Sequence, residues 1–574
     1  MSSATAAREL GARGSRTSMD GVSIATDLPT AAAAVLAAVP RWWTARAAAA
    51  GLSGRWLDVA YAVDVPTPVL PGVSASTVVE EHTSGEQLGG VYVSALTPQV
   101  RARHGRHYTP DDLAARLWAM TRRALGHTAT PRRLPGLVRD PACGAGALLL
   151  APLREHLVAL RRTDPQMILT NVSSAIEGVD ADPAAVWLAN VVLAAELLPI
   201  LAEVPEVGRR PLPVLASVGD GLAPPSRPAR AVVMNPPYGR VRLDPVERER
   251  FAAFLYGHAN LYGLFLAAGL QSLDDHGVLS ALVPTSFTAG RYFSNLRRAL
   301  AETAPLREVT FVAERGGVFT GVLQETCLAT FTRTKPRKTG VSTSNGHLTQ
   351  VANVISPRGS GPWLLPRRSD DAHVAAAAGV MPLNLSSAGW RVSTGPLVWN
   401  RRRADLHAEP GTARLPVLWA ADIDGGHLHR DRARGLMRYL QTGTDADRAV
   451  MTLSEPAVVV QRTTAPEQTR RIVAVELTVD DLTEWGGALV VENHVNVIRP
   501  TTPTPALSRS TLARVLATPT MDRLMRCLAG SVAVSAYELE SLPLPGAEVL
   551  SIWETLTVDA LNTAVASAYH PEPM

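Results

Sequence analysis

Short apolar segments alternate with helix-length apolar segments through the middle of the chain, from Thr109 to about Phe331. The short segments are bounded by turn residues and read LPGLVRD, AIEGVD, VLASVGD, AVVMNPPY and GVLSALVP. Longer runs typical of buried helices lie between them, such as ALLLAPLREHLVAL and AAVWLANVVLAAELL. Short buried strands that alternate with helices are typical of a doubly wound, mostly parallel sheet. The pattern therefore predicts an α/β fold for this region.

The pattern changes on both sides of this region. Residues 28–65 are rich in alanine and contain three tryptophans, and we expect them to form helices. A polar stretch from Thr332 to His347, TRTKPRKTGVSTSNGH, is typical of a linker or an exposed loop. The chain beyond it contains strand-like runs, AVVVQRT and ALVVENHVNVIRP, and is long enough for an α+β domain of its own. We therefore expect three domains, at residues 1–100, 101–345 and 346–574.

Composition and charge bear on the number of cores and on the kind of partner. The chain has 574 residues, of which 46% are hydrophobic and 19% charged, so it can bury more than one core. All but two of its 56 basic residues are arginines, since Lys335 and Lys338 are the only lysines. Arginine suits phosphate and guanine contacts, and the isoelectric point of about 9.1 favours a nucleic-acid partner weakly.

The cysteines and the N-terminal residues bear on the cellular compartment. Cys143, Cys327 and Cys527 are too few and too scattered for a disulfide framework or a CxxC metal site. The first residues carry charges where a signal peptide needs an apolar core, and no segment is predicted to span a membrane. Histidines show no metal-ligand spacing, so we expect no metal. These features predict a cytoplasmic protein.

A glycine-rich turn follows the first predicted strand. Asp140-Pro-Ala-Cys-Gly-Ala-Gly146 joins that strand to a helix, and Gly144 and Gly146 allow a ligand to approach the backbone closely. A tight strand-to-helix turn without a ligand is the alternative. Asp180 ends the second strand, where it can accept hydrogen bonds from a ribose, and Asp220 follows the third, where it can accept from an adenine amino group. Because no Gly-Lys-Ser/Thr follows, we expect a nucleoside without a polyphosphate.

The fourth strand ends in Asn235-Pro236-Pro237-Tyr238. Consecutive prolines cannot continue a central strand, so the chain turns at the carboxyl end of the sheet, where open α/β sheets bind ligands. Asn235 Oδ1 and the Pro236 carbonyl can accept two N–H bonds while Tyr238 stacks on a ring. This combination suits a planar base that carries an amino group. A chance proline-rich turn is the alternative.

These motifs together resemble the S-adenosylmethionine-dependent DNA adenine-N6 methyltransferases. The resemblance covers about Gln87 to Phe331 and follows the motif order YTP, DPACGAG, NPPY and C-terminal target-recognition domain, as in type II modification enzymes of the TaqI and PstI kind. It implies a Rossmann-like sheet and a catalytic domain at 101–345 that is followed by a DNA-reading domain at 346–574. The segment between Gly146 and Asp180 is longer than usual, and helical insertions occur there in the family.

The resemblance also implies roles for individual residues. S-adenosylmethionine is the implied cofactor, and the residues implied to bind it are Tyr108, Thr109, Pro110, Asp140, Ala142, Gly144, Gly146, Asp180, Asp220 and Asn235. The residues implied to act on the flipped adenine are Asn235, Pro236, Tyr238 and Phe319. Direct transfer needs no covalent intermediate, so Cys143 is interpreted as a packing residue.

The implied partner is double-stranded DNA, with the chain acting as a monomer and a separate endonuclease cutting the same site. Other functions use related chemistry and stay open at this point. They are methylation of a glutamine side chain, methylation of cytosine N4, service as the methylating subunit of a multi-subunit restriction complex, and DNA binding without catalysis.

Overall fold

The computed structural model describes residues 28–65, 68, 72–104, 108–127, 131–312, 325–430, 437–464, 468–528 and 533–570. The chain divides into two compact units. The first consists of Met1–Ala114 with Pro131–Gly221, and the second of Ala115–Thr130 with Leu222–Met574. No helix within the described ranges is long and apolar enough to cross a membrane.

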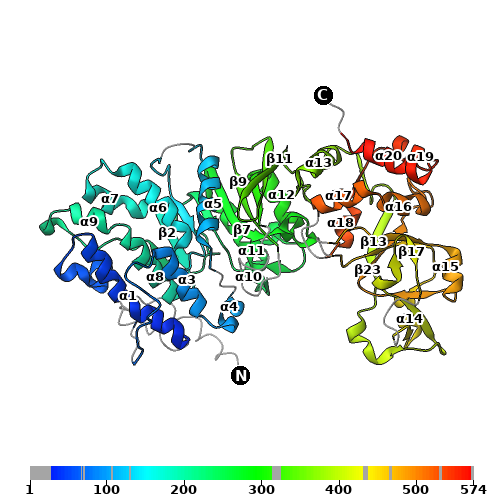
Figure 1. The fold of residues 1–574 in the computed structure, drawn as a ribbon, viewed down its shortest axis with the longest axis horizontal. Coiled ribbons are helices and arrows are strands. Elements are labelled where there is room, and N and C mark those ends of the chain that lie inside the picture. The colour runs from blue at the N-terminus through cyan, green and yellow to red at the C-terminus, as the bar shows by residue number, and fades with distance from the viewer. Residues whose placement is uncertain are drawn as a thin grey trace, which may run out of the picture. The chain divides into compact units, whose positions relative to one another are not determined.

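The first unit begins with helices, as the sequence predicts. α1 (Thr30–Ala49) buries Trp42, whose indole donates a 2.7 Å hydrogen bond to the carbonyl of Thr83. α3 (Gly85–Ala95) begins with a capping box in which Ser84 and Gln87 each accept from the other's backbone N–H. Figure 1 shows α1 and α3, in blue, packed beside α8 (Pro183–Ala195). Two shorter helices accompany them, α2 (Val59–Val63) and α4 (Pro98–His104).

The sheet of the first unit has three parallel strands. β1 (Val138–Asp140), β2 (Ile176–Asp180) and β3 (Ala216–Val218) pair in that order, so their carboxyl ends share one edge. α8 is buried from Ala184 to Ala194, and every residue of that span is apolar except Asn190, which hydrogen-bonds to the backbone at Leu215 and Ala216. The long segment before β2 holds α6 (Ala147–Leu160) and α7 (Pro165–Asn171), and α9 (Leu198–Glu203) follows α8.

The second unit carries a mixed set of strands. β4 (Ala229–Met234) pairs in parallel with β7 (Leu273–Pro284), β9 (Thr326–Thr332) runs antiparallel to β7, and β8 (Leu306–Val312) pairs antiparallel with β9. The hydroxyl of Thr121 on α5 (Asp111–Ala124) donates to Ser280 on β7 at 2.8 Å, which fixes the helix on the sheet. The other elements of this region are α10 (Pro245–Arg250), α11 (Leu261–Gln271), α12 (Ser294–Thr303) and the short pair β5 (Arg240–Val241) and β6 (Ala259–Asn260).

The predicted linker between Thr332 and His347 is wrong. That stretch contains β10 (Lys338–Ser344), which pairs in parallel with β8, and it continues into β11 (Leu348–Ile355), which pairs antiparallel with β10. Thr339 is fully buried and its hydroxyl donates to the carbonyl of Leu306 at 2.6 Å. The side-chain hydroxyls that suggested a solvated loop are therefore compatible with a strand, because threonine is a β-branched residue that can satisfy its hydroxyl on the backbone.

The C-terminal part of the second unit combines sheets and helices (Figure 1). One sheet has the order β13 (Trp390–Thr394), β23 (Val495–Pro500), β20 (Ala457–Gln461) and β21 (Ala474–Leu477). Its two faces bury different apolar clusters, because Val458 and Ile498 pack in one and Val459 and Val497 in the other. The runs AVVVQRT and ALVVENHVNVIRP thus supply strands, as the sequence predicts. The domain limits at 100 and 345 stay predictions.

The remaining elements surround this sheet. A second sheet has the order β14 (Leu406–His407), β18 (Tyr439–Gln441), β15 (Arg414–Leu418), β22 (Leu489–Val491) and β19 (Thr452–Leu453). Two short pairs are β12 (Leu383–Asn384) with β24 (Pro543–Leu544) and β16 (Ile423–Asp424) with β17 (His427–Leu428). The helices are α13 (Ala372–Ala378), α14 (Asp445–Met451), α15 (Val479–Glu484), α16 (Arg509–Leu516), α17 (Pro519–Leu528), α18 (Ala536–Glu540), α19 (Ala547–Trp553) and α20 (Val558–Ala568).

Candidate functional site

The glycine-rich turn joins β1 to α6 in the first unit. Asp140 ends β1 with 1% of its surface exposed, and its Oδ1 accepts a 3.0 Å hydrogen bond from the backbone N–H of Ala142. Gly144 and Gly146 have φ of +50° and +86°, which L side chains rarely adopt. A Cβ at Gly144 would meet no atom within 4 Å, so the turn is open on that side.

Asp180, at the end of β2, fixes this turn. Its Oδ2 accepts from the backbone N–H of Gly144 at 2.8 Å, and its Oδ1 accepts from the N–H of Asp182 at 2.9 Å. An ionised carboxylate has about four acceptor positions, so these two bonds alone do not saturate it. Asp220 is exposed just beyond β3, where the N–H of Gly219 donates to the Asp180 carbonyl at 2.9 Å. The structure thus brings together the turn and the ends of β2 and β3, as the sequence predicts.

Burial changes the ionisation of this turn. Burial, together with the charge of Asp180, raises the pKa of Asp140 to about 8, although the hydrogen bond from Ala142 opposes the change. Burial and the same two carboxylates raise the pKa of the Cys143 thiol well above its ordinary value. A Cβ at Gly178 would lie 2.9 Å from Cys143 Sγ, so the thiol is tightly packed against β2. A buried, protonated thiol is a poor nucleophile, which agrees with a packing role.

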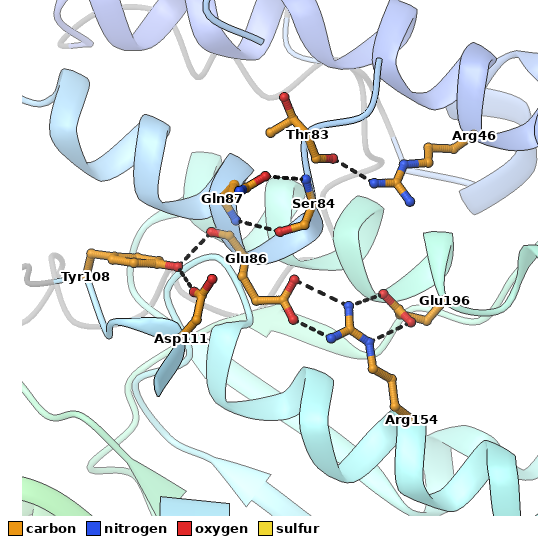
Figure 2. Close-up of polar contacts among 9 residues, drawn as sticks. All are labelled: Arg46, Thr83, Ser84, Glu86, Gln87, Tyr108, Asp111, Arg154 and Glu196. Carbon is orange, nitrogen blue, oxygen red and sulfur yellow. Dashed lines mark hydrogen bonds and ion pairs between the residues drawn. The ribbon is translucent and has the colours of Figure 1, made fainter. Parts of the chain in front are cut away.

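The Tyr108-Thr109-Pro110 motif precedes α5, and α3 holds its tyrosine. Figure 2 shows the Tyr108 hydroxyl directed at the backbone carbonyl of Glu86, 2.9 Å away, and at the carboxylate of Asp111. The Tyr108 ring lies against α3, since a Cβ at Gly90 would be 3.2 Å from its Cζ. Thr109 is buried and Pro110 is half-buried.

The two neighbouring glycines of α3 therefore lie against two different predicted motifs. A Cβ at Gly89 would lie 3.1 Å from the Cβ of Ala145 in the glycine-rich turn, whereas Gly90 faces Tyr108. Sequence reasoning did not identify this helix as part of the candidate site. The signal that was available is the capping box Ser84-x-x-Gln87, which marks the start of a helix.

An ion-pair network holds α3 in place (Figure 2). The guanidinium of Arg154, on α6, binds the carboxylates of Glu86 on α3 and of Glu196 at the end of α8, the latter at 2.6 and 2.8 Å. Burial disfavours the charged form of Glu86, but the hydrogen bonds and charge of Arg154 give it a net lowered pKa. Arg154 thus connects three helices, one of which presents the Glu86 carbonyl to Tyr108.

We predict that Gly90→Ala separates stability from cofactor binding. Alanine favours a helix interior over glycine by about 0.5–1 kcal/mol, which offsets part of the cost of displacing Tyr108, so the melting temperature should change little. The added methyl group should displace the Tyr108 ring and weaken S-adenosylmethionine binding several-fold, as measured by calorimetry. Ser94→Ala, at an exposed position of the same helix, is the matched control. Unchanged affinity in Gly90→Ala would exclude Tyr108 from cofactor positioning.

The Asn235-Pro236-Pro237-Tyr238 motif lies in the second unit, directly after β4. Asn235 and Tyr238 are half-buried, and Pro236 is buried. The Tyr238 hydroxyl lies 3.2 Å from Asn235 Oδ1 and 3.1 Å from the carbonyl oxygen of Leu282 on β7. Because an amide oxygen has two lone pairs, Oδ1 can accept from Tyr238 and from one further donor.

Aromatic neighbours fix the ring of Tyr238. Tyr262 meets it edge-on with 6.1 Å between ring centroids and itself stacks on Phe293 at 5.0 Å. The Tyr262 hydroxyl forms a 2.7 Å hydrogen bond with Ser286. Burial raises the pKa of Tyr238 well above its ordinary value, so this hydroxyl stays a donor. Tyr262 belongs to the run Asn260–Phe265, which resembles a later motif of the same family, but its contact with Tyr238 was not predicted. Phe319 lies outside the described residues.

Comparison with known proteins finds similarity to restriction-modification methylases. Residues 230–319, which include the Asn-Pro-Pro-Tyr turn, match the family described as Eco57I restriction-modification methylase. The type II methyltransferase M.PstI of Providencia stuartii is 24% identical over 335 residues, which are 55% of this chain and 65% of that protein. M.BsuBI of Bacillus subtilis is 22% identical over 331 residues, with the same two coverages.

The chain is a distant homologue of type II methyltransferases. It spans just under two thirds of the length of these two relatives. Among solved structures, the type IIL restriction-modification enzyme MmeI in complex with DNA is similar with a TM-score of 0.50 and 12% identity, over 86% of this chain and 80% of that one. At this identity the likeness concerns the fold alone, which is the α/β fold that the sequence predicts.

Proposed function

We propose that this chain is a site-specific DNA methyltransferase that transfers a methyl group from S-adenosylmethionine to adenine N6 of a flipped-out base. The observation that carries the proposal is the Asn235–Tyr238 turn at the carboxyl end of β4, where an amide oxygen is held by a tyrosine hydroxyl. The match of residues 230–319 to the Eco57I restriction-modification methylases and the homology to M.PstI support it.

The first unit has residues that fit the cofactor. The Asp180 carboxylate lies at the end of β2, where it suits a ribose as hydrogen-bond acceptor, the turn is open at Gly144, and Asp220 is exposed just beyond β3. Acidic residues also suit a cation, and S-adenosylmethionine supplies a methyl group on a positively charged sulfur. Tyr108, Thr109 and Pro110 complete the proposed set beside α3, together with Asp140, Ala142 and Gly146 of the turn.

The second unit has residues that fit the acceptor base. The lone pair of adenine N6 is delocalised into the ring, so two hydrogen bonds accepted by Asn235 Oδ1 and the Pro236 carbonyl would favour a more tetrahedral, more nucleophilic nitrogen. Tyr238 keeps Asn235 in position through its hydroxyl, and its ring offers a stacking face. Phe319 is proposed as a second stacking ring. No covalent enzyme intermediate is required.

The proposed substrate is double-stranded DNA. Flipping a base costs a few kcal/mol, and stacking on an aromatic ring returns about 1–3 kcal/mol per base, so aromatic residues can offset much of this cost. We propose that the C-terminal region, 346–574, reads the target sequence. We further propose that the chain acts as a cytoplasmic monomer and that a separate endonuclease cuts the same unmethylated site.

Sequencing that detects modified bases tests the proposal directly. DNA from cells that express the full chain should carry N6-methyladenine at one short sequence, and DNA from cells that express Asn235→Ala should not. Methylation of cytosine N4 would overturn the base assignment. Methylation that appears only with a second specificity chain would favour a multi-subunit complex instead.

The raised pKa of Asp140 predicts a pH dependence of cofactor affinity. With a pKa of about 8, the side chain is mostly protonated at neutral pH in the free protein. A cation bound beside it favours the carboxylate, so binding should release a proton and tighten as pH rises towards 8, then level off. Calorimetry from pH 6 to 9 measures this. Asp140→Asn removes the contribution of this side chain, so any pH dependence that remains comes from the cofactor's own titrating groups. Identical pH profiles for the wild type and Asp140→Asn would refute the prediction.

A further inference from the structure

Two cavities in the C-terminal part of the second unit are lined by several arginines. The larger, about 1000 Å³, is lined by Arg368, Arg470, Arg523 and Arg526 among others. Its arginines have local partners: Arg523 pairs with Asp371 at 2.8 Å, and Arg526 pairs with Asp522 at 3.0 Å. These guanidinium groups connect α17 to neighbouring segments, so their charges are already compensated within the fold.

The smaller cavity, about 500 Å³, differs in this respect. We call it the arginine cavity, and it is lined by Arg391, Glu455, Pro456, Arg499, Pro500, Thr501 and Arg509. Arg391 on β13 stands directly opposite Arg499 on β23 in an antiparallel pair. Directly opposed residues share a face of the sheet, and like charges in that position destabilise it. The two guanidinium groups thus face each other across the strands, although most other residue pairs at these positions would stabilise the sheet more.

The structure offers these cations little compensation. Among the described residues, neither the Arg391 nor the Arg499 side chain has a hydrogen-bond acceptor or an ion-pair partner, and the Nε of Arg499 is shielded from solvent without an acceptor. The third guanidinium, Arg509 on α16, lies 3.5 Å from Glu476. Glu455 is the one acidic side chain that lines the cavity. With Arg509 paired to Glu476, the two guanidinium groups of Arg391 and Arg499 therefore face the space against the one carboxylate of Glu455.

We propose that the arginine cavity binds a phosphate of the DNA backbone. The planar guanidinium fork matches the geometry of phosphate oxygens, and an anion between Arg391 and Arg499 would turn their repulsion into attraction. The choice of DNA as the source of the phosphate rests on the proposed function. A phosphate contact positions the duplex but does not distinguish one base from another. The contact would therefore hold the β13–β23 end of the sheet on the DNA whatever the base sequence.

Binding of labelled duplexes by the full chain tests this inference. We would measure fluorescence anisotropy with a short duplex that carries the recognition site and with one that does not, over a range of salt concentrations. Arg499→Gln and Arg391→Gln should each lose about one phosphate contact. At about 0.1 M salt this should weaken binding roughly tenfold on both duplexes and make the log–log salt slope about 0.9 less steep.

Two further variants test whether the effect is specific to the charge in this cavity. Glu455→Gln removes the negative charge from the same cavity and should strengthen binding. Arg162→Gln, at an exposed position of the first unit, is the matched charge control and should leave affinity and slope unchanged. Arg391 is exposed on the edge strand β13, so its replacement tests the proposal even if Arg499→Gln fails to fold.

The outcomes separate this inference from the proposed function. A wild-type chain that binds no duplex would overturn both. Wild-type binding that is unchanged in folded Arg391→Gln and Arg499→Gln would overturn the inference alone. Calorimetry with inorganic phosphate identifies a free-anion site: if the variants lose phosphate binding but keep duplex binding, the cavity does not serve DNA and the inference is wrong.

Discussion

Replacement of Asn235 by alanine is expected to reduce methyl transfer about 100- to 1000-fold while cofactor affinity stays nearly unchanged. The estimate corresponds to the loss of one preorganised polar group that acts on the reacting atom. Asn235 lies in the second unit, directly after β4, and its side chain is proposed to act on the acceptor nitrogen and not on the methyl donor. Tritium transfer from labelled S-adenosylmethionine to duplex DNA measures turnover, and calorimetry measures cofactor binding.

Tyr238→Phe is the matched control for this prediction. It keeps the ring but removes the hydroxyl that lies 3.2 Å from Asn235 Oδ1 and 3.1 Å from the Leu282 carbonyl. If the hydroxyl only orients Asn235, the loss of turnover should be much smaller than in Asn235→Ala. Substantial turnover by Asn235→Ala would contradict the mechanism, whatever the behaviour of the control.

Asp180→Ala is expected to have the largest effect on cofactor binding. The substitution removes a ribose acceptor and also the acceptor for the N–H of Gly144, which shapes the turn. Hydrogen bonds to charged groups contribute about 1.5–3 kcal/mol, so S-adenosylmethionine affinity should fall about 10- to 150-fold. Titration calorimetry measures the change, and thermal unfolding shows whether the fold is retained.

Asp180→Asn distinguishes the two roles of this carboxylate. It keeps one acceptor oxygen and the shape of the side chain but loses the charge and the second oxygen, so it should bind the cofactor with intermediate affinity. Wild-type affinity in a folded Asp180→Ala protein would remove Asp180 from the proposed site.

The strand ends that carry the candidate site were predictable because strand and loop have different local patterns. Each apolar run before Asp140, Asp180 and Asn235 is a strand in the structure, and the polar residue follows at its carboxyl end. The stretch 338–344 was not predicted as a strand, because its threonines and serines have the composition of a loop. Only the pairing with β8 and β11 shows that their hydroxyls are satisfied in a sheet.

The contacts that hold Tyr108 and α3 in place could not be predicted from the sequence either. Glu86, Arg154 and Glu196 lie on three helices separated by tens of residues, and nothing local indicates that their side chains meet. The opposed pair Arg391 and Arg499 is another case, because strand register across more than a hundred residues is a tertiary property. Motifs that act within one turn could be read from the chain, whereas contacts between distant segments could not.

The hairpin of β10 and β11 has a practical consequence for exchanging C-terminal regions between relatives. Gly346 sits at its tip with φ of +89°, between two strands that pair over their whole length. A chimaera joined near residue 346 would pair β10 of one parent with β11 of the other, whose side chains and register shift at Val341/Ser342 need not match. A junction after Ile355 keeps both strands from one parent, so donor C-terminal regions should be grafted at that point.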